Sequence, residues 1–116
     1  MVIAFEKTVA DAIATIERDL GLTSAELAGG LGVTTRTLER WRKGESLPQR
    51  EARERLAELA AVRDHAFETF YPEDVPGWIR HRNHYLAGLT PAQAVAAGSI
   101  ESVEGALVVI DYGLYV

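Results

Sequence analysis

The chain has 116 residues, with 47% hydrophobic and 25% charged residues, which is typical of one soluble globular domain or of two very small ones that share a core. It contains no cysteine, which excludes disulfide scaffolds and thiolate metal sites, and it shows neither a signal-peptide pattern nor an apolar run near the ~18–20 residues of a membrane helix. A net charge of −5 argues against nucleic-acid binding by the chain as a whole, and we expect a cytoplasmic protein without a membrane partner.

The first two predicted helices are separated by a glycine and a threonine. Apolar residues recur at three- and four-residue steps over residues 9–20, and Gly21 is placed to end this helix in a left-handed conformation. Thr23 and Glu26 have the spacing of a capping box for a second helix, which stops at Gly32.

A third helix and a long fourth helix follow. Thr34 is placed to cap the third helix, which turns Trp41 inward and ends at Gly44. Ser46 is the expected cap of the fourth helix, which we expect to start near Pro48 because proline is favoured at the first helical position. At about 23 residues this helix is near 35 Å long, and we expect it to form a spine between the two halves of the molecule.

The last third of the chain predicts short helices separated by proline and glycine. We expect a helical turn at residues 75–80, a loop at 83–88, and a helix from Pro91 that Thr90 caps. Ser99 is then placed to cap the final helix, whose apolar face includes the residues from Val103 to Ile110. The predicted fold is all-α: a helix-turn-helix bundle (1–47), a connecting long helix (48–71) and a small helical C-terminal module (72–116).

Positive charge is concentrated around the third helix. Residues 32–63 carry a net charge of +3, whereas residues 1–31 carry −3 and residues 64–116 carry −5. The strength of a surface field depends on local arrangement, so this block is compatible with DNA binding by one face. Because +3 is modest, we expect weak DNA affinity from a single chain.

The segment Leu22 to Gly44 resembles the Xre-type helix-turn-helix. Ala28 is the small residue where two crossing helices touch, Gly32 lies in the turn, and Trp41-Arg42-Lys43-Gly44 matches the usual tryptophan and basic-glycine end. Helix-turn-helix proteins read base edges with the outward side chains of the second helix and hold phosphates with nearby polar groups. The expected DNA-binding residues are Thr34, Thr35, Arg36, Arg40, Arg42 and Lys43, with Arg36 the candidate to read guanine. The alternatives are a three-helix corner without a DNA role and, for Arg36, a solvated surface arginine.

The segment from Val75 to the end resembles the toxin-binding domain of the Xre/MbcA/ParS antitoxin family. The matching positions are Trp78, Asn83, Gly88, Thr90-Pro91, Ala94-Val95, Gly98, Val103 to Ile110, and Gly113 with Tyr115. The sequence departs from the family pattern where His84 follows Asn83 and where Gln93-Ala94-Val95 replaces a glutamate-leucine-leucine run. The two resemblances together cover nearly the whole chain, in the family's order.

This resemblance implies an antitoxin whose partner is a RES-domain toxin, an enzyme that consumes NAD. The antitoxin covers the toxin's active site with its C-terminal module, represses its own promoter through the helix-turn-helix, and forms a homodimer or a hetero-oligomer with the toxin. The expected toxin-binding residues are Trp78, Arg80, Arg82, Asn83, Leu114, Tyr115 and Val116. For Trp78 the alternative is a core position, and for the apolar tail it is packing back onto the chain.

No catalytic constellation stands out. His81 and His84 are three residues apart, but no third metal ligand lies at a convincing offset, and Gly29-Gly30 follows no strand that would form a dinucleotide loop. We therefore expect neither enzymatic activity nor a cofactor. The alternative function is a stand-alone helix-turn-helix regulator whose C-terminal module dimerises or senses a ligand, and an apolar cavity beside Trp78 would favour it.

Overall fold

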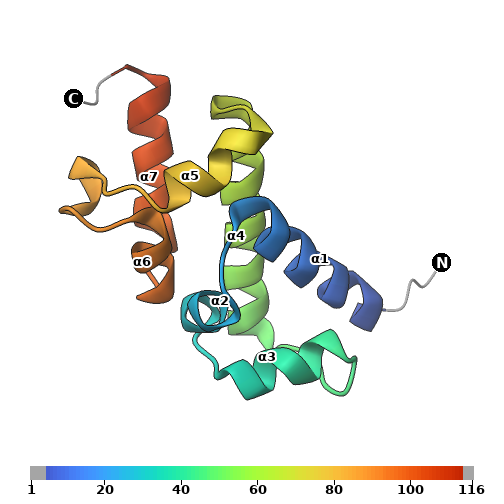
Figure 1. The fold of residues 1–116 in the computed structure, drawn as a ribbon. Helices are drawn as coiled ribbons and strands as arrows, with labels where there is room; N and C mark the ends of the chain where they lie inside the picture. Colours follow the sequence, from blue (N-terminus) through green and yellow to red (C-terminus); the bar gives the residue numbers. More distant parts are fainter. Residues whose placement is uncertain (1–4, 114–116) are drawn as a thin grey trace.

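The computed structural model describes the backbone of residues 5–113 and the side chains of residues 9–113, and every regular element in that stretch is helical (Figure 1). This confirms the all-α prediction. The helices are α1 (Phe5–Leu20), α2 (Ser24–Leu31), α3 (Thr35–Arg42), α4 (Arg50–Thr69), α5 (Val75–Ile79), α6 (Pro91–Ala96) and α7 (Ile100–Asp111), with short 3₁₀ helices at Pro72–Asp74 and His84–Leu86.

The helix ends of the front half follow the predicted capping chemistry. Thr23 and Glu26 form both bonds of a capping box at α2, and the Thr34 side chain accepts from the Thr37 N–H at α3. Gly21 and Gly32 both have positive φ, near +73°, where a side chain is disfavoured. The local signals therefore suffice to define α1, α2 and α3.

The start of α4 differs from the prediction. The helix begins at Arg50 after Gln49, it spans 20 residues, and Ser46 does not cap it. Pro48 is buried before the helix begins, and Gln49 is still extended with ψ 172°, so the proline belongs to the preceding loop and not to the first helical turn. Ser99 likewise precedes α7 without a side-chain capping bond.

The buried residues form one cluster to which all seven α-helices contribute. The long helix α4 lies in the middle, with α7 on one side and α1 on the other (Figure 1). Leu59 and Val62 on α4 are essentially inaccessible, as are Ile13 on α1 and Leu107 on α7. The predicted spine is therefore the element on which both halves pack.

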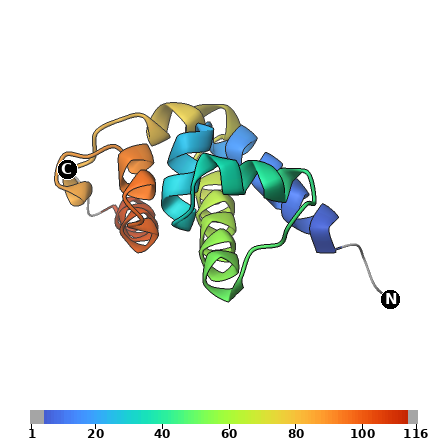
Figure 2. The same cartoon turned by 90° about the horizontal axis from the view of Figure 1, so that it is seen from below.

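A second contact joins the halves without α4. Helix α2 lies against α6, as the view from below shows (Figure 2). A Cβ on Gly29 would lie 2.4 Å from the Ala96 carbonyl oxygen, and one on Gly30 would lie 2.8 Å from a methyl of Val95. The two glycines therefore permit a close approach of helix backbones, a function that the helix-turn-helix pattern alone did not indicate.

Within residues 5–113, none of the helices has the length and apolarity needed to cross a membrane.

Candidate partner-binding groove and helix-turn-helix face

Helix α3 presents the predicted DNA-binding side chains on its outer side. Thr35, Arg36, Arg40 and Lys43 are exposed, while Leu38 and Trp41 on the opposite side are buried. Among the residues that the structure describes, Arg36, Arg40 and Lys43 form no ion pair, although Glu39 and Glu45 share their surface hollow. This face therefore offers three unpaired cations, two on α3 and one at the residue that ends it.

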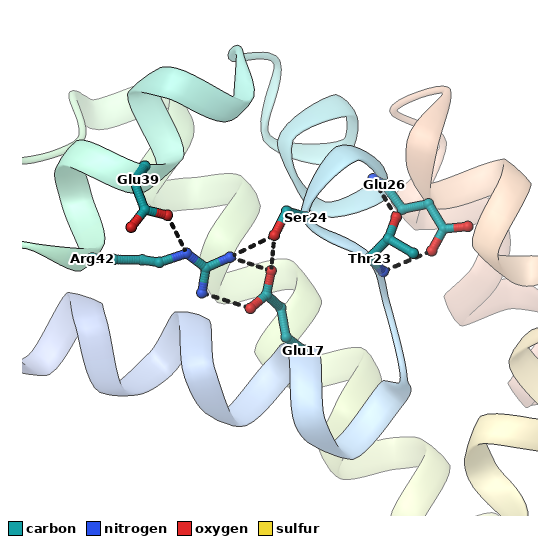
Figure 3. A network of polar contacts seen from close by, with 6 residues as sticks. All are labelled: Glu17, Thr23, Ser24, Glu26, Glu39 and Arg42. Carbon is teal, nitrogen blue, oxygen red and sulfur yellow. Dashed lines mark hydrogen bonds and ion pairs between the residues drawn. The ribbon is translucent and has the colours of Figure 1, made fainter.

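Arg42 has a different environment from its neighbours. It donates two hydrogen bonds to the carboxylate of Glu17 on α1, one of them 2.6 Å long, and a third of 3.0 Å to the Ser24 hydroxyl (Figure 3). The hydrogen bond to Glu17 raises the pKa of Arg42 despite an opposing effect of burial. Arg42 thus fixes α3 against α1 and the start of α2, and its guanidinium is already engaged.

A groove of about 630 Å³ lies in the C-terminal part of the molecule, between the loop after α5 and the outer side of α7. Phe70 and Trp78 pack against each other there, with ring centroids 5.3 Å apart and planes tilted by 38°. The lining residues are Phe70, Trp78, His81, Arg82, Asn83, His84, Tyr85, Ala106, Val109 and Ile110. An apolar floor with a polar and basic rim is typical of a site that receives apolar side chains.

The predicted toxin-binding residues divide into three groups. Trp78, Arg82 and Asn83 all line the groove, and Trp78 is half-buried against the core. Arg80 points elsewhere, because it binds the carboxylate of Glu26 in a bidentate ion pair and also the carbonyl oxygen of Gly21. Its hydrogen bond lowers the pKa of Glu26. Leu114, Tyr115 and Val116 lie outside the described residues.

Asn83 stabilises the loop that forms part of the groove wall. Its side-chain oxygen accepts from the Tyr85 N–H at 2.8 Å, and its backbone bonds to Leu89 and Gly88 close the loop that follows α5. Because these bonds occupy both the side chain and the backbone of Asn83, the residue fixes the conformation of the loop that forms the groove rim.

Four apolar groove residues escaped the sequence analysis. Phe70 falls within the predicted long helix (48–71), Tyr85 within the predicted loop (83–88), and Val109 and Ile110 within the last predicted helix. The available signal was Gly105, where a Cβ would lie 2.9 Å from the Tyr85 hydroxyl oxygen. A glycine in the middle of a helix indicates a close neighbour, but the sequence does not reveal which one.

His65 links α4 to α7. Its two ring nitrogens contact the carboxylates of Glu104 and Asp111, and the Thr69 hydroxyl donates to Asp111 at 2.7 Å. Burial lowers the pKa of His65, but the hydrogen bonds that its ring donates to Asp111 and Glu104 outweigh burial and raise this pKa. The hydrogen bond from His65 also lowers the pKa of Asp111.

His81 and His84 both lie at the groove rim and are exposed. In the part of the chain that the structure describes, no group of three or more histidine and acidic side chains is placed to hold a metal ion.

Comparison with known proteins finds relatives over nearly the full length. The chain is 33% identical over 101 residues to the mycobacterial cidal antitoxin MbcA of Mycobacterium bovis and of Mycobacterium tuberculosis, covering 87% of this chain and 88% of the relative. It is 27% identical over 117 aligned residues to the probable mycobacterial cidal antitoxin Rv3188 of M. tuberculosis, covering both chains fully.

Among solved structures, the fold matches a chain in the crystal structure of the M. tuberculosis MbcT–MbcA toxin-antitoxin complex. The TM-score is 0.68 at 29% identity, and the match covers 92% of this chain and 96% of that chain. No protein-family model matches the sequence.

Proposed function

The chain belongs to the MbcA antitoxin family, and from this membership we propose that it is the antitoxin of a toxin-antitoxin pair. The observation that carries the proposal is the match over nearly the whole length, in sequence and in fold, to a protein solved in complex with its toxin. We further propose that the partner is a RES-domain toxin that consumes NAD. The family resemblance of the C-terminal segment is the support for that finer assignment.

The groove beside Trp78 is the proposed centre of the toxin-binding surface. Its apolar floor and the unpaired Arg82 at its rim favour a partner segment that combines an apolar side chain with a carboxylate. Asn83 shapes the rim, and Leu114, Tyr115 and Val116 belong to the proposed surface through the family pattern. Arg80 supports this surface from behind, because its ion pair with Glu26 ties the end of α5 to α2.

The outer face of α3 is the proposed DNA-binding surface, through which the antitoxin represses its own promoter. Thr35, Arg36, Arg40 and Lys43 are exposed there, and Thr34 sits at the helix start where base edges are reached. Arg42 enters this proposal as the residue that fixes α3. Three unpaired cations give a single chain only weak affinity for DNA. Repression therefore depends on several chains in one assembly, because binding of one chain raises the effective concentration of the others at the DNA.

Co-expression with a RES-type toxin from the same genome tests the proposal, with cell growth and intracellular NAD as readouts. The intact chain should restore both. Trp78→Ala together with Arg82→Glu should abolish rescue, and Arg36→Ala should leave rescue intact while weakening promoter binding. If the intact chain neither restores growth nor co-purifies with the toxin, the RES-type partner is wrong.

One observation favours a second candidate, a helix-turn-helix regulator that senses a ligand. The groove next to Trp78 has the volume of a small-molecule site. In that case the chain alone should bind its promoter tightly, and an apolar ligand should change that affinity. An antitoxin should instead bind promoter DNA more tightly when its toxin is present.

A further inference from the structure

A second hollow adjoins the outer face of α3. It has a volume of about 400 Å³ and lies between the turn after α2, one side of α3, the loop before α4 and the first turns of α4. Arg40 lines this hollow and also the surface hollow that holds Arg36 and Lys43, so the two hollows meet at Arg40. We call it the α3–α4 hollow, and its polar lining includes Thr37, Arg40, Ser46, Gln49, Glu51 and Arg55.

Arg55 on α4 is half-buried in the wall of the α3–α4 hollow and has no counter-ion among the described residues. Its guanidinium lies on the turn that joins α2 to α3, because a Cβ on Gly32 would collide with Nη1 of Arg55. It forms neither a hydrogen bond nor an ion pair with any residue that the structure describes, although Glu51 lines the same hollow. The other two half-buried arginines of the described chain, Arg42 and Arg63, each bind a carboxylate. A partly desolvated cation without a partner is unfavourable, so Arg55 is placed to receive an anion.

We propose that Arg55 and Arg40 hold a phosphate of the DNA backbone in the α3–α4 hollow. This proposal rests on the DNA-binding function proposed for α3 and adds to it a contact from α4. An α-helix of about 10–12 Å diameter fills a major groove about 12 Å wide, so a phosphate strand runs along each flank of the helix. Groups directly beside α3 therefore meet phosphates, which fix the orientation of the protein on the duplex without reading its sequence.

The chemistry of the α3–α4 hollow also suits a phosphate. The guanidinium groups of Arg40 and Arg55 line it together with one carboxylate, that of Glu51, which leaves an excess of positive charge. The planar donors of arginine match the oxygens of a phosphate in bidentate geometry. The hydroxyl of Thr37 and the amide of Gln49 line the same hollow and supply neutral donors.

Binding of labelled DNA to the full chain, followed by fluorescence anisotropy between about 50 and 200 mM salt, tests this contact. The two probes are the duplex upstream of the chain's own gene and a scrambled duplex of the same length. Arg55→Gln should weaken binding of both duplexes by the same factor, on the order of tenfold. It should also lower the slope of log K against log salt by about one, because one phosphate contact is lost. Arg36→Ala should instead reduce the preference for the promoter duplex.

Three further variants separate a phosphate contact from a packing role of Arg55. Arg18→Gln is the matched control, because it removes the same charge from an exposed residue of α1 that lines neither hollow, and it should leave the salt slope unchanged. Arg55→Lys should retain the slope, since lysine also binds phosphate, whereas lysine would not restore the packing of a guanidinium on the turn. Glu51→Gln should tighten binding of both duplexes roughly twofold, a gain that unfolding cannot produce.

The proposal is overturned if Arg55→Gln changes the salt slope no more than Arg18→Gln does. It is also overturned if Arg55→Lys lowers the slope and the melting temperature as much as Arg55→Gln, because Arg55 then acts only in packing. In either case, a promoter preference that Arg36→Ala removes would leave the proposed function of α3 intact. If the parent chain binds neither duplex at the lowest salt, both proposals are wrong.

Discussion

At the scale of single residues, two arginines of α3 illustrate what a cationic side chain does in this molecule. Arg36 is exposed and forms no ion pair with any residue described, whereas Arg42 is bound by Glu17, Ser24 and Glu39. Both belong to the same basic block of the sequence. Only the tertiary structure distinguishes an exposed arginine without an ion pair from one that stabilises the packing of α3 on α1.

Replacing Arg42 should therefore cost stability. Arg42→Ala leaves the carboxylate of Glu17, which is 16% exposed, without its strongest partner, and we expect a loss of about 1–2 kcal/mol in the free energy of unfolding. Urea unfolding followed by circular dichroism measures this change. Arg36→Ala is the control and should stay within about 0.5 kcal/mol of the parent. Equal effects of the two substitutions would contradict the division of roles.

Helix caps could be predicted residue by residue, but ion pairs could not. Thr23 and Thr34 cap through atoms within three residues, so the pattern is visible in a short window. Arg42 finds Glu17 at a separation of 25 residues, and Arg80 finds Glu26 at 54, which no local pattern shows. The same limit explains why the sequence did not reveal the ion pair of Arg80 with Glu26.

At the scale of elements, the contact between α2 and α6 has almost no room for a side chain. Gly29→Ala places a methyl group 2.4 Å from a backbone oxygen of Ala96, which helices can avoid only by moving apart. Overpacking of this kind costs about 1–3 kcal/mol, more than the gain of up to ~1 kcal/mol in helix propensity. We expect thermal denaturation to show a clearly lowered melting temperature.

Gly77→Ala is the matched control for this experiment. Gly77 lies within α5, its φ is negative, and a Cβ there would have no neighbour within 4 Å. The substitution should be neutral or slightly stabilising through helix propensity. If Gly29→Ala behaves like Gly77→Ala, the close approach of α2 and α6 is not needed for stability.

The contact of α4 with α7 should depend on pH through His65. The pKa of His65 is raised above the ordinary 6.5. The protonated ring therefore stabilises the folded state fully below pH 6.5, and this stabilisation is lost as the pH rises through the higher folded-state pKa. The pKa of Asp111 is lowered, so its carboxylate stabilises the folded state above pH 3.8, and this stabilisation is lost as the pH falls through the lower folded-state pKa. We expect the free energy of unfolding to be smaller at about pH 9 than at about pH 6, and the drop to shrink in His65→Gln. Identical profiles for the two proteins would refute this.

At the scale of the whole molecule, the C-terminal part shares its core with the rest of the chain. Val95 on α6 meets α2, and Val103 and Leu107 on α7 belong to the cluster that α4 completes. A fragment of residues 72–116 should therefore show little helix by circular dichroism and no cooperative melting, whereas the full chain melts cooperatively. A sigmoidal melt of the fragment would show that the module folds alone.

The sequence predicted the helices and their order better than their assembly. Periodicity and glycine ends located every α-helix to within a few residues, including α4, which begins at Arg50 and not at Pro48. The groove could not be predicted, because Phe70, Tyr85 and Ile110 come from three separate elements. The division at 1–47, 48–71 and 72–116 stays a prediction, as do the DNA-binding and toxin-binding residues.

The glycine contact between α2 and α6 also limits how family members can be recombined. In a chimera that joins residues 1–47 of one relative to residues 48–116 of another, positions 29 and 96 come from different proteins, and any residue larger than glycine at position 29 would clash with the backbone of residue 96. Residues 1–47 are therefore exchangeable only when glycine is kept at position 29. Grafting only the outward side chains of α3 transfers the proposed DNA specificity and leaves the contact between α2 and α6 unchanged.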